Sequence, residues 1–222
     1  GISTFRDAGG LWDKYPVEQV ATPEGYARNP ELVINFYNER RKQLLDVVPN
    51  AGHLGVADLE RDFNVTVVTQ NVDNLHERAG STHVIHLHGE LTKVCSSRDP
   101  YNPHFVKELA PEEYEVKLGD KAGDGTQLRP FIVWFGESVP EIETAIRYVE
   151  QADIFVIIGT SLNVYPAAGL LNYVPRAAEV YLIDPKPVDT HVMRPIHVIQ
   201  KGASEGVKEL KALLAATQPP LP

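Results

Sequence analysis

Two histidines stand one residue apart in the segment His86-Leu87-His88-Gly89-Glu90, at the end of an expected strand. A neutral imidazole takes up a proton near pH 7, so either side chain could act as a general base. Strand alternation would put both on one face, and the spacing does not choose between them. A surface or hydrogen-bonded core position is the commoner outcome for a lone histidine.

Polar residues and a glycine follow three other expected strands at their carboxyl ends, which is where ligands bind in open α/β sheets. Gly159 permits close backbone approach, and Thr160 and Ser161 offer hydroxyls and amides suited to phosphate or ribose. A single polar segment between a strand and a helix usually has only the structural role of a turn. Their joint placement points to a nucleotide ligand. The segments are Gln70-Asn71-Val72-Asp73-Asn74, Gly159-Thr160-Ser161 and Asp184.

The elements that must position these residues are short apolar strands alternating with helices. Strands are expected over 65–69, 84–87, 131–135, 154–158, 180–183 and 197–199. Helices are expected over 30–48, 50–61, 141–151, 167–173 and 204–214. The alternation predicts an α/β fold with a mostly parallel sheet and helices on both faces. Residues 92–128 lack a convincing period and predict a small inserted lobe, so the main domain would comprise residues 1–91 and 129–222.

Composition narrows the class of protein. The 222 residues are 43% hydrophobic, and 21 Lys and Arg against 30 Asp and Glu give a net charge of −9. This charge disfavours general nucleic-acid binding, which needs a basic surface. No apolar run reaches membrane-spanning length, so we expect no membrane partner. The only cysteine, Cys95, fits a reducing compartment, and we expect a cytoplasmic protein.

Five ordered segments resemble the signatures of the sirtuins, which are NAD-dependent protein-lysine deacylases. The resemblance runs from Gly1 to the turn at 202–204, and it implies a Rossmann-like NAD-binding fold. The segments are Gly1-Ile2-x-x-Phe5-Arg6, Thr69-Gln70-Asn71-Val72-Asp73-Asn74-Leu75-His76, Leu87-His88-Gly89, Val133-Trp134-Phe135-Gly136-Glu137 and Gly159-Thr160-Ser161-Leu162-x-Val164-x-Pro166-Ala167-Ala168.

The resemblance implies that NAD is consumed as a co-substrate, and it assigns residues to the parts of NAD. Ile2, Asn71 and Asp73 would form the nicotinamide pocket. Phe5 and Arg6 would lie over the nicotinamide ribose and the phosphates. Further contacts would come from Gln70, Gly159, Thr160, Ser161, Asp184 and Ala203.

The resemblance also implies the chemistry, with His88 as the base and Asn71 beside it in the catalytic site. The acyl oxygen of the modified lysine attacks the anomeric carbon of the nicotinamide ribose, and nicotinamide leaves. His88 then deprotonates a ribose hydroxyl that attacks the alkylimidate carbon, and water completes transfer to give free lysine and acyl-ADP-ribose. The acylated protein or peptide would bind as an added strand. Its contacts would be Val133, Phe135, Gly136, Glu137, Leu162 and Val164.

Tyr37 and Arg40 stand three residues apart on the expected helix 30–48 and therefore share a face. One interpretation is a solvated charged face, because Arg41 and Lys42 follow. The other is that the segment is similar to class III sirtuins, the bacterial deacetylase-desuccinylase branch. There a tyrosine and an arginine bind the carboxylate of succinyl- or malonyl-lysine, which suits the planar guanidinium.

The chain departs from the family pattern in three places. Sirtuins usually hold a structural zinc on two Cys-x-x-Cys pairs, whereas this chain has only Cys95, and we therefore expect no metal. Asp184 stands where asparagine is usual, although a carboxylate can accept from both ribose hydroxyls. A first strand and a Gly-Ala-Gly-x-Ser loop would precede Gly1, and we expect that these residues are missing from the sequence.

Three alternatives stay open at this stage. A dehydrogenase is disfavoured because no Gly-x-Gly-x-x-Gly turn is present. Transfer of ADP-ribose to protein would use the same activation of NAD. A non-catalytic NAD-binding module is the third, but binding alone would not require a base at His88.

Overall fold

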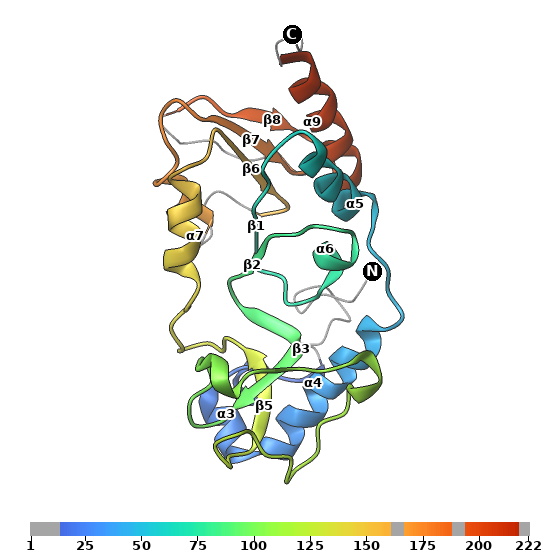
Figure 1. Ribbon diagram of the computed structural model, residues 1–222, viewed down its shortest axis with the longest axis vertical. Helices are drawn as coiled ribbons and strands as arrows, with labels where there is room; N and C mark the ends of the chain where they lie inside the picture. The colour runs from blue at the N-terminus through green and yellow to red at the C-terminus, as the bar shows by residue number, and fades with distance from the viewer. Residues whose placement is uncertain (1–13, 161–166, 188–193, 218–222) are drawn as a thin grey trace. The chain divides into compact units, whose positions relative to one another are not determined.

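The computed structural model describes residues 14–160, 167–187 and 194–217 (Figure 1). The chain divides into two compact units. Unit 1 comprises residues 1–48, 68–74 and 86–140, and unit 2 comprises residues 49–67, 75–85 and 141–222. Each unit has a three-stranded sheet and an apolar core of its own.

The sheet of unit 2 is parallel, with the strand order β6 (Ile154–Ile158), β7 (Glu179–Ile183) and β8 (His197–Ile199). Apart from Glu179 at the start of β7, every residue of β6 and β7 is aliphatic or aromatic, as is typical of sheets whose two faces are covered by helices. The middle strand, β7, is buried along all but its first residue. The parallel strands confirm the α/β class expected from the alternating pattern.

Two helices of unit 2 pack against each other, α5 (Ala51–Asp58) and α9 (Ala203–Thr217), and α9 also contacts β7 (Figure 1). The side chain of Asn50 caps the start of α5 by accepting a backbone hydrogen bond. A Cβ at Gly206 would collide with Ile183 of β7. Glycine at this position therefore lets the first turns of α9 approach the sheet closely.

The sheet of unit 1 is antiparallel, with β3 (Gly89–Ser96) between β4 (Lys107–Glu108) and β5 (Leu128–Ile132). The strand expected at 131–135 therefore begins at Leu128, and it pairs antiparallel. Residues 92–96, which belong to the segment without a convincing hydrophobic period, are also part of a strand, β3. The hydrophobic pattern missed it because β3 buries a polar residue, Ser96, completely. The boundaries of a separate 92–128 lobe stay a prediction.

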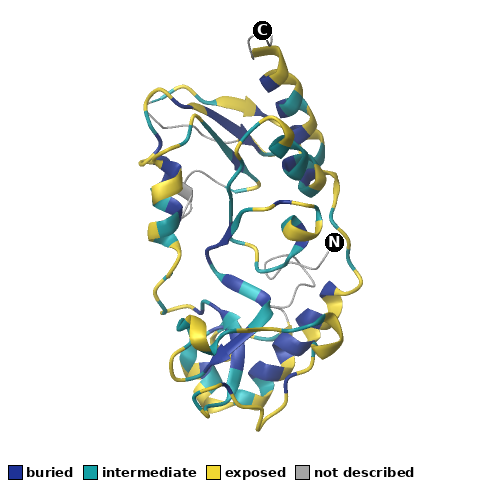
Figure 2. Cartoon of the chain, viewed as in Figure 1, coloured by how far each residue is buried: buried dark blue, intermediate teal, exposed yellow. Residues whose placement is uncertain are grey.

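Helix α4 (Pro30–Leu44) packs against β3 and β5 and buries one face, seen in Figure 2 as its dark blue side. It begins after the cap Asn29 with proline in its first turn, as expected, and it ends four residues before the expected end at 48. Two polar side chains tie it to the strands and loops below. Asn38 exchanges hydrogen bonds of 2.8 and 2.9 Å with the backbone of Val116, and Arg41 donates to the carbonyl of Leu91 at 2.9 Å.

None of the described helices has the length and apolar character that a membrane crossing needs.

The remaining helices and strands are short. These elements are α2 (Val17–Val20), α3 (Pro23–Arg28), η1 (Leu59–Arg61), β1 (Val67–Thr69), α6 (Leu75–Arg78), β2 (Val84–His86), η2 (Pro103–Phe105), η3 (Pro111–Glu113), α7 (Ile142–Val149) and α8 (Ala167–Leu171).

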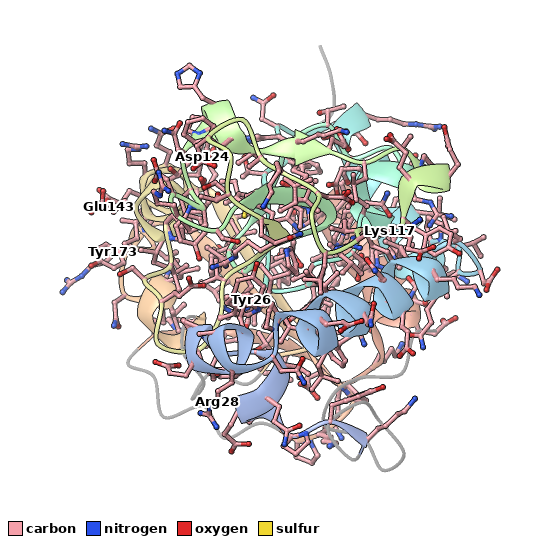
Figure 3. The ribbon with its side chains drawn as sticks, turned by 90° about the horizontal axis from the view of Figure 1, so that it is seen from below. Tyr26, Arg28, Lys117, Asp124, Glu143 and Tyr173 are labelled. Carbon is pink, nitrogen blue, oxygen red and sulfur yellow. The ribbon has the colours of Figure 1, made fainter. Side chains whose placement is uncertain are left out.

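Hydrogen bonds around Ser96 hold the loops of unit 1 together. The Ser96 hydroxyl donates to Asp124 at 2.5 Å and accepts from the backbone N–H groups of Arg98 and Asp99 at 3.0 and 2.9 Å. Asp124, labelled in Figure 3, also accepts from the Thr126 hydroxyl at 2.7 Å. The hydrogen bonds from Ser96 and Thr126 lower the pKa of Asp124 to about 2, which keeps it an acceptor above that pH. Ser96, Asp124 and Thr126 together form the Ser96 cluster. This cluster is a polar cross-link between the end of β3 and the loop before β5.

We expect Ser96→Ala to lower the free energy of unfolding by about 1–3 kcal/mol, because it removes a fully buried hydroxyl and leaves its partners unsatisfied. Urea unfolding followed by circular dichroism measures this change. The exposed Glu112→Ala serves as the control and should stay within about 0.5 kcal/mol of the parent protein. Equal midpoints for Ser96→Ala and the control would show that the Ser96 cluster does not support unit 1.

Candidate active site

His88 lies in a turn between two strands, where its imidazole is only partly buried. Its backbone carbonyl accepts from the Val133 N–H at 2.9 Å, which fixes the turn against the end of β5. Gly89 follows with φ of +88°, and a Cβ there would collide with the Phe131 carbonyl. Glycine is therefore required after His88, because any side chain would push β5 away from the turn.

Burial lowers the pKa of His88 and outweighs an opposing hydrogen bond with the backbone of Gln70. The imidazole is thus mainly neutral near pH 7, as a general base must be. A lowered pKa in a partly exposed histidine is one of the marks of a functional site.

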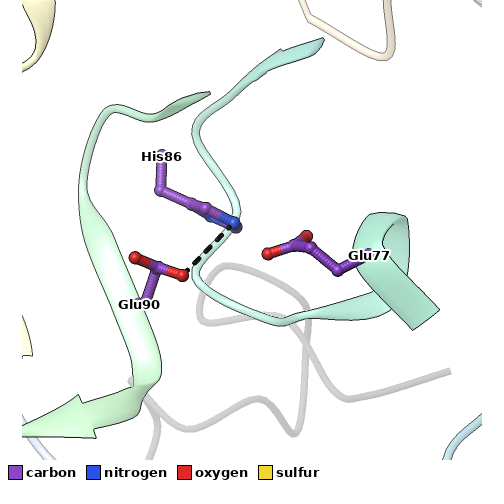
Figure 4. A group of neighbouring side chains, drawn as sticks. All are labelled: Glu77, His86 and Glu90. Atoms are coloured by element: carbon purple, nitrogen blue, oxygen red, sulfur yellow. Dashed lines mark ion pairs between the residues drawn. The ribbon is translucent and has the colours of Figure 1, made fainter. Parts of the chain in front are cut away.

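His86 occupies a different environment, although the alternating pattern placed it on the same face as His88. Strand β2 ends at His86, so His88 lies outside the strand and the alternation argument for it is wrong. His86 is buried, its Nδ1 lies 3.0 Å from the Asn71 carbonyl, and its Nε2 lies 3.9 Å from Glu90 (Figure 4). These contacts make His86 an anchor for the neighbouring loop and favour His88 as the base.

The loop after β1 contains Gln70, Asn71 and Asp73, and it is attached to the His88 region at several points. The carbonyl of Thr69 accepts from the Leu87 N–H at 3.0 Å, and the carbonyl of Val72 accepts from the Leu91 N–H at 2.8 Å. The structure therefore brings Gln70, Asn71 and Asp73 to the same part of unit 1 as His88.

Tyr37 and Arg40 are both buried on α4, at 3% and 9% exposure. Arg41 is buried as well, and of Tyr37, Arg40, Arg41 and Lys42 only Lys42 is exposed. The interpretation of these residues as a solvated charged face is therefore wrong. Burial lowers the pKa of Arg40, while the charge of Asp73 opposes this effect. Helix α4 thus holds a cation and a phenol in a shielded position within unit 1.

The segment after β5 was expected to contact the substrate. Val133 lies beside His88 through its backbone hydrogen bond, and the side chain of Phe135 is 62% exposed. Gly136 has φ of +90° and is exposed. The Glu137 carboxylate instead turns inward, where it accepts from the backbone N–H of Trp134 at 2.8 Å.

Sequence reasoning missed the buried pair that holds this segment. Arg129 donates to both carboxylate oxygens of Glu137 at 3.0 and 3.1 Å and stacks on the Trp134 ring at 3.8 Å. Tyr101 donates to Glu137 at 3.0 Å. Burial alone would raise the pKa of Glu137, but the bonds and charge of Arg129 hold it below its usual value. No spacing rule links Arg129 to Glu137, since the strand and turn between them set their distance.

Unit 2 supplies the other predicted contacts at the ends of its parallel strands. Gly159 follows β6 with φ of +68°, and its N–H donates to the Ile183 carbonyl at 3.0 Å. Thr160 is partly buried, and Asp184 directly follows β7. An Asp184 carboxylate oxygen accepts from the Lys186 N–H at 2.8 Å. Ala203 begins α9, after β8.

Six residues of the expected site lie outside the described residues. They are Ile2, Phe5, Arg6, Ser161, Leu162 and Val164.

Cys95 does not fit a structural zinc site. Its thiol is fully buried and lies 3.7 Å from the Pro130 carbonyl, and burial raises its pKa to about 12. Zinc binds the thiolate, which this environment disfavours. Among the described residues, no group of three or more His, Cys, Asp or Glu ligand atoms close enough to share a metal includes Cys95.

Parallel strands ending in glycine, hydroxyl and acidic residues, together with a neutral partly exposed histidine, are features of an α/β enzyme that acts on a nucleotide ligand. Residues 1–166 match the Sir2 family, and the chain belongs to that family. This also confirms the resemblance to the sirtuins.

Similar curated proteins are named NAD-dependent protein deacylase. One from Bacteroides thetaiotaomicron is 85% identical over 214 residues, which are 96% of this chain and 92% of that protein. One from Helicobacter pylori is 48% identical over 210 residues, covering 95% of this chain and 89% of that protein. Both alignments extend over nearly the whole chain.

Solved structures of Sir2 homologues share the fold, which confirms the Rossmann-like prediction. A Sir2 homologue in complex with NAD is 36% identical with a TM-score of 0.80, covering 98% of this chain and 85% of that one. A mutant Sir2 homologue in complex with 2'-O-acetyl ADP-ribose is also 36% identical with a TM-score of 0.80, covering 100% and 89%.

The environment of Cys95 generates a prediction about metal content. Protein purified without chelator should contain well under about 0.2 zinc per chain by mass spectrometry of the metal, because one protonated thiol cannot replace four thiolates. Cys95→Ser should leave the metal content unchanged. Near-stoichiometric zinc in the parent protein would contradict this prediction, and its loss in Cys95→Ser would identify Cys95 as a ligand.

Proposed function

We propose that this Sir2 family member removes acyl groups from lysine side chains with His88 as its general base, yielding nicotinamide, acyl-ADP-ribose and the free lysine. NAD is the co-substrate in this family and supplies the ribose that receives the acyl group. The observation that carries the role of His88 is its partly exposed imidazole, whose pKa burial lowers, beside the loop of Gln70 and Asn71. Such an imidazole can accept a proton from a ribose hydroxyl near neutral pH.

The residues that would hold NAD fit its chemistry. Gly159, with positive φ and an exposed backbone, lets a phosphate approach the end of β6, and Thr160 adds a hydroxyl. Asp184 presents a carboxylate after β7 that can accept from ribose hydroxyls. In unit 1, Asn71 and Asp73 offer an amide and a carboxylate for the nicotinamide carboxamide.

We further propose that the enzyme accepts acidic acyl groups, namely succinyl and malonyl, besides acetyl. Support comes from the buried pair of Tyr37 and Arg40, which share one face of α4. A shielded guanidinium binds a carboxylate more strongly than an exposed one, since water competes less. The planar guanidinium can donate two parallel hydrogen bonds, and the phenol can add a third.

Acylated proteins or peptides are the proposed partners, bound as an added strand along the segment Gly136–Glu137. The exposed side chain of Phe135 and the exposed backbone of Gly136 support this proposal. We also propose a cytoplasmic location, which the free buried thiol of Cys95 supports because a reducing compartment preserves thiols.

Replacing the proposed base should separate chemistry from binding. We expect His88→Ala to lower kcat on acetyl-lysine peptide by about 10²- to 10⁴-fold, the usual contribution of a general base. The Kd for NAD, measured by calorimetry, should change less than about threefold. His104→Ala, which removes an exposed histidine, is the control and should keep full activity. Near-full turnover in His88→Ala would show that another group is the base.

Arg40→Met should change the acyl preference. We expect kcat/KM on succinyl-lysine peptide to fall about 10- to 100-fold more than on acetyl-lysine peptide, since hydrogen bonds to charged groups contribute about 1.5–3 kcal/mol each. Lys42→Met removes an exposed cation from the same helix and should leave the ratio unchanged. Equal losses of Arg40→Met on both peptides would refute a carboxylate-binding role.

A further inference from the structure

We infer that Trp134 is a positioning residue for acyl selectivity, because its indole directs the hydroxyl proton of Tyr37 toward the acidic acyl group. This inference rests on the proposed carboxylate-binding role of Tyr37 and Arg40. Trp134 itself need not touch the substrate. It would act through the orientation of one proton.

The direction of the hydrogen bond between the two residues carries the argument. The Trp134 Nε1 lies 3.0 Å from the Tyr37 hydroxyl, and both residues are buried, at 2% and 3% exposure. An indole N–H can only donate, so the phenol oxygen must be the acceptor in this bond. The single phenol proton is then directed away from Trp134, where it can be donated to another acceptor.

The Tyr37 hydroxyl also keeps its proton. Burial raises the pKa of Tyr37, and this effect outweighs the lowering by the hydrogen bond from Trp134. Tyr37 is therefore a neutral donor throughout the pH range of ordinary assays. A carboxylate is a strong acceptor for this donor, whereas the methyl group of an acetyl chain offers none.

The indole is held rigidly enough to direct a proton. Arg129 covers the Trp134 ring, with its guanidinium carbon 3.8 Å from the ring centre. Glu137 binds both Arg129 and the backbone N–H of Trp134, so ring and backbone are fixed by the same ion pair. Tyr26 packs on the ring with a centroid distance of 5.3 Å. A ring packed in this way has little freedom to release the Tyr37 hydroxyl.

The test compares Trp134→Phe, Tyr37→Phe and the double variant on succinyl- and acetyl-lysine peptides. Phenylalanine keeps an aromatic ring at Trp134 but removes the N–H. We expect Trp134→Phe to lower the succinyl-to-acetyl ratio of kcat/KM by about 2- to 10-fold, the value of one hydrogen bond. In the Tyr37→Phe background the same change should leave the ratio as it is, because the phenol it acts through is gone.

The outcomes separate this inference from the proposal beneath it. A ratio that falls in Tyr37→Phe but not in Trp134→Phe overturns the inference and leaves the acyl proposal standing. A further fall in the double variant also overturns it, because Trp134 would then act independently of Tyr37. A ratio unchanged in both Tyr37→Phe and Arg40→Met refutes the carboxylate-binding proposal itself.

A second measurement serves if Trp134→Phe does not fold. The chain has two tryptophans, Trp12 and Trp134, so nitrogen-15 spectra of the parent protein give two indole N–H signals, assigned with Trp12→Phe. We expect Tyr37→Phe to shift the Trp134 signal, and succinyl-lysine peptide with NAD to shift it more than acetyl-lysine peptide does. The inference is overturned if the chemical shift of the Trp134 signal does not change in Tyr37→Phe, or if both peptides shift it equally.

Discussion

The buried ion pair of Arg129 and Glu137 is the interaction on which much of unit 1 depends. Arg129 is 4% exposed in its side chain and Glu137 15%, so removing either partner leaves a charge in a poorly solvated place, at a cost of about 3–5 kcal/mol. The pair fixes the turn after β5, the Trp134 ring and the hydroxyl of Tyr101. Through Trp134 it extends to Tyr37 on α4, and so connects the strand that flanks His88 to the proposed acyl-binding residues.

Polar cross-links hold several segments of unit 1 together. The Ser96 cluster ties the end of β3 to the loop before β5, and Asn38 and Arg41 tie α4 to the backbone around Val116 and Leu91. Each such hydrogen bond contributes modestly to the stability of the fold. A buried donor or acceptor that loses its partner destabilises the fold by more than that. These hydrogen bonds between buried polar groups help to stabilise unit 1, which makes it sensitive to single polar substitutions at those positions.

Residue spacing alone leaves His86 and His88 equivalent, whereas their surroundings in the structure differ. His86 is enclosed by the Asn71 carbonyl and Glu90, while His88 stands in the following turn with partial exposure. Strand β2 ends at His86, and His88 lies in the turn that follows. Gly89, with positive φ, then lets β3 begin in close contact with β5. The imidazole of His88 is partly exposed, and partial burial lowers its pKa. A general base at neutral pH needs both accessibility and a neutral imidazole.

By itself the sequence determined the α/β class, the strands at 154–158 and 197–199, and the family, because these depend on local hydrophobic pattern and on ordered short motifs. It also brought Tyr37 and Arg40 to one helix face, since helical spacing is a local property. Only the tertiary structure decided that this face is buried, that β5 pairs antiparallel, and that Arg129 and Trp134 support Glu137 and Tyr37. Burial and long-range pairing depend on which segments pack together, and no residue spacing along the chain records that.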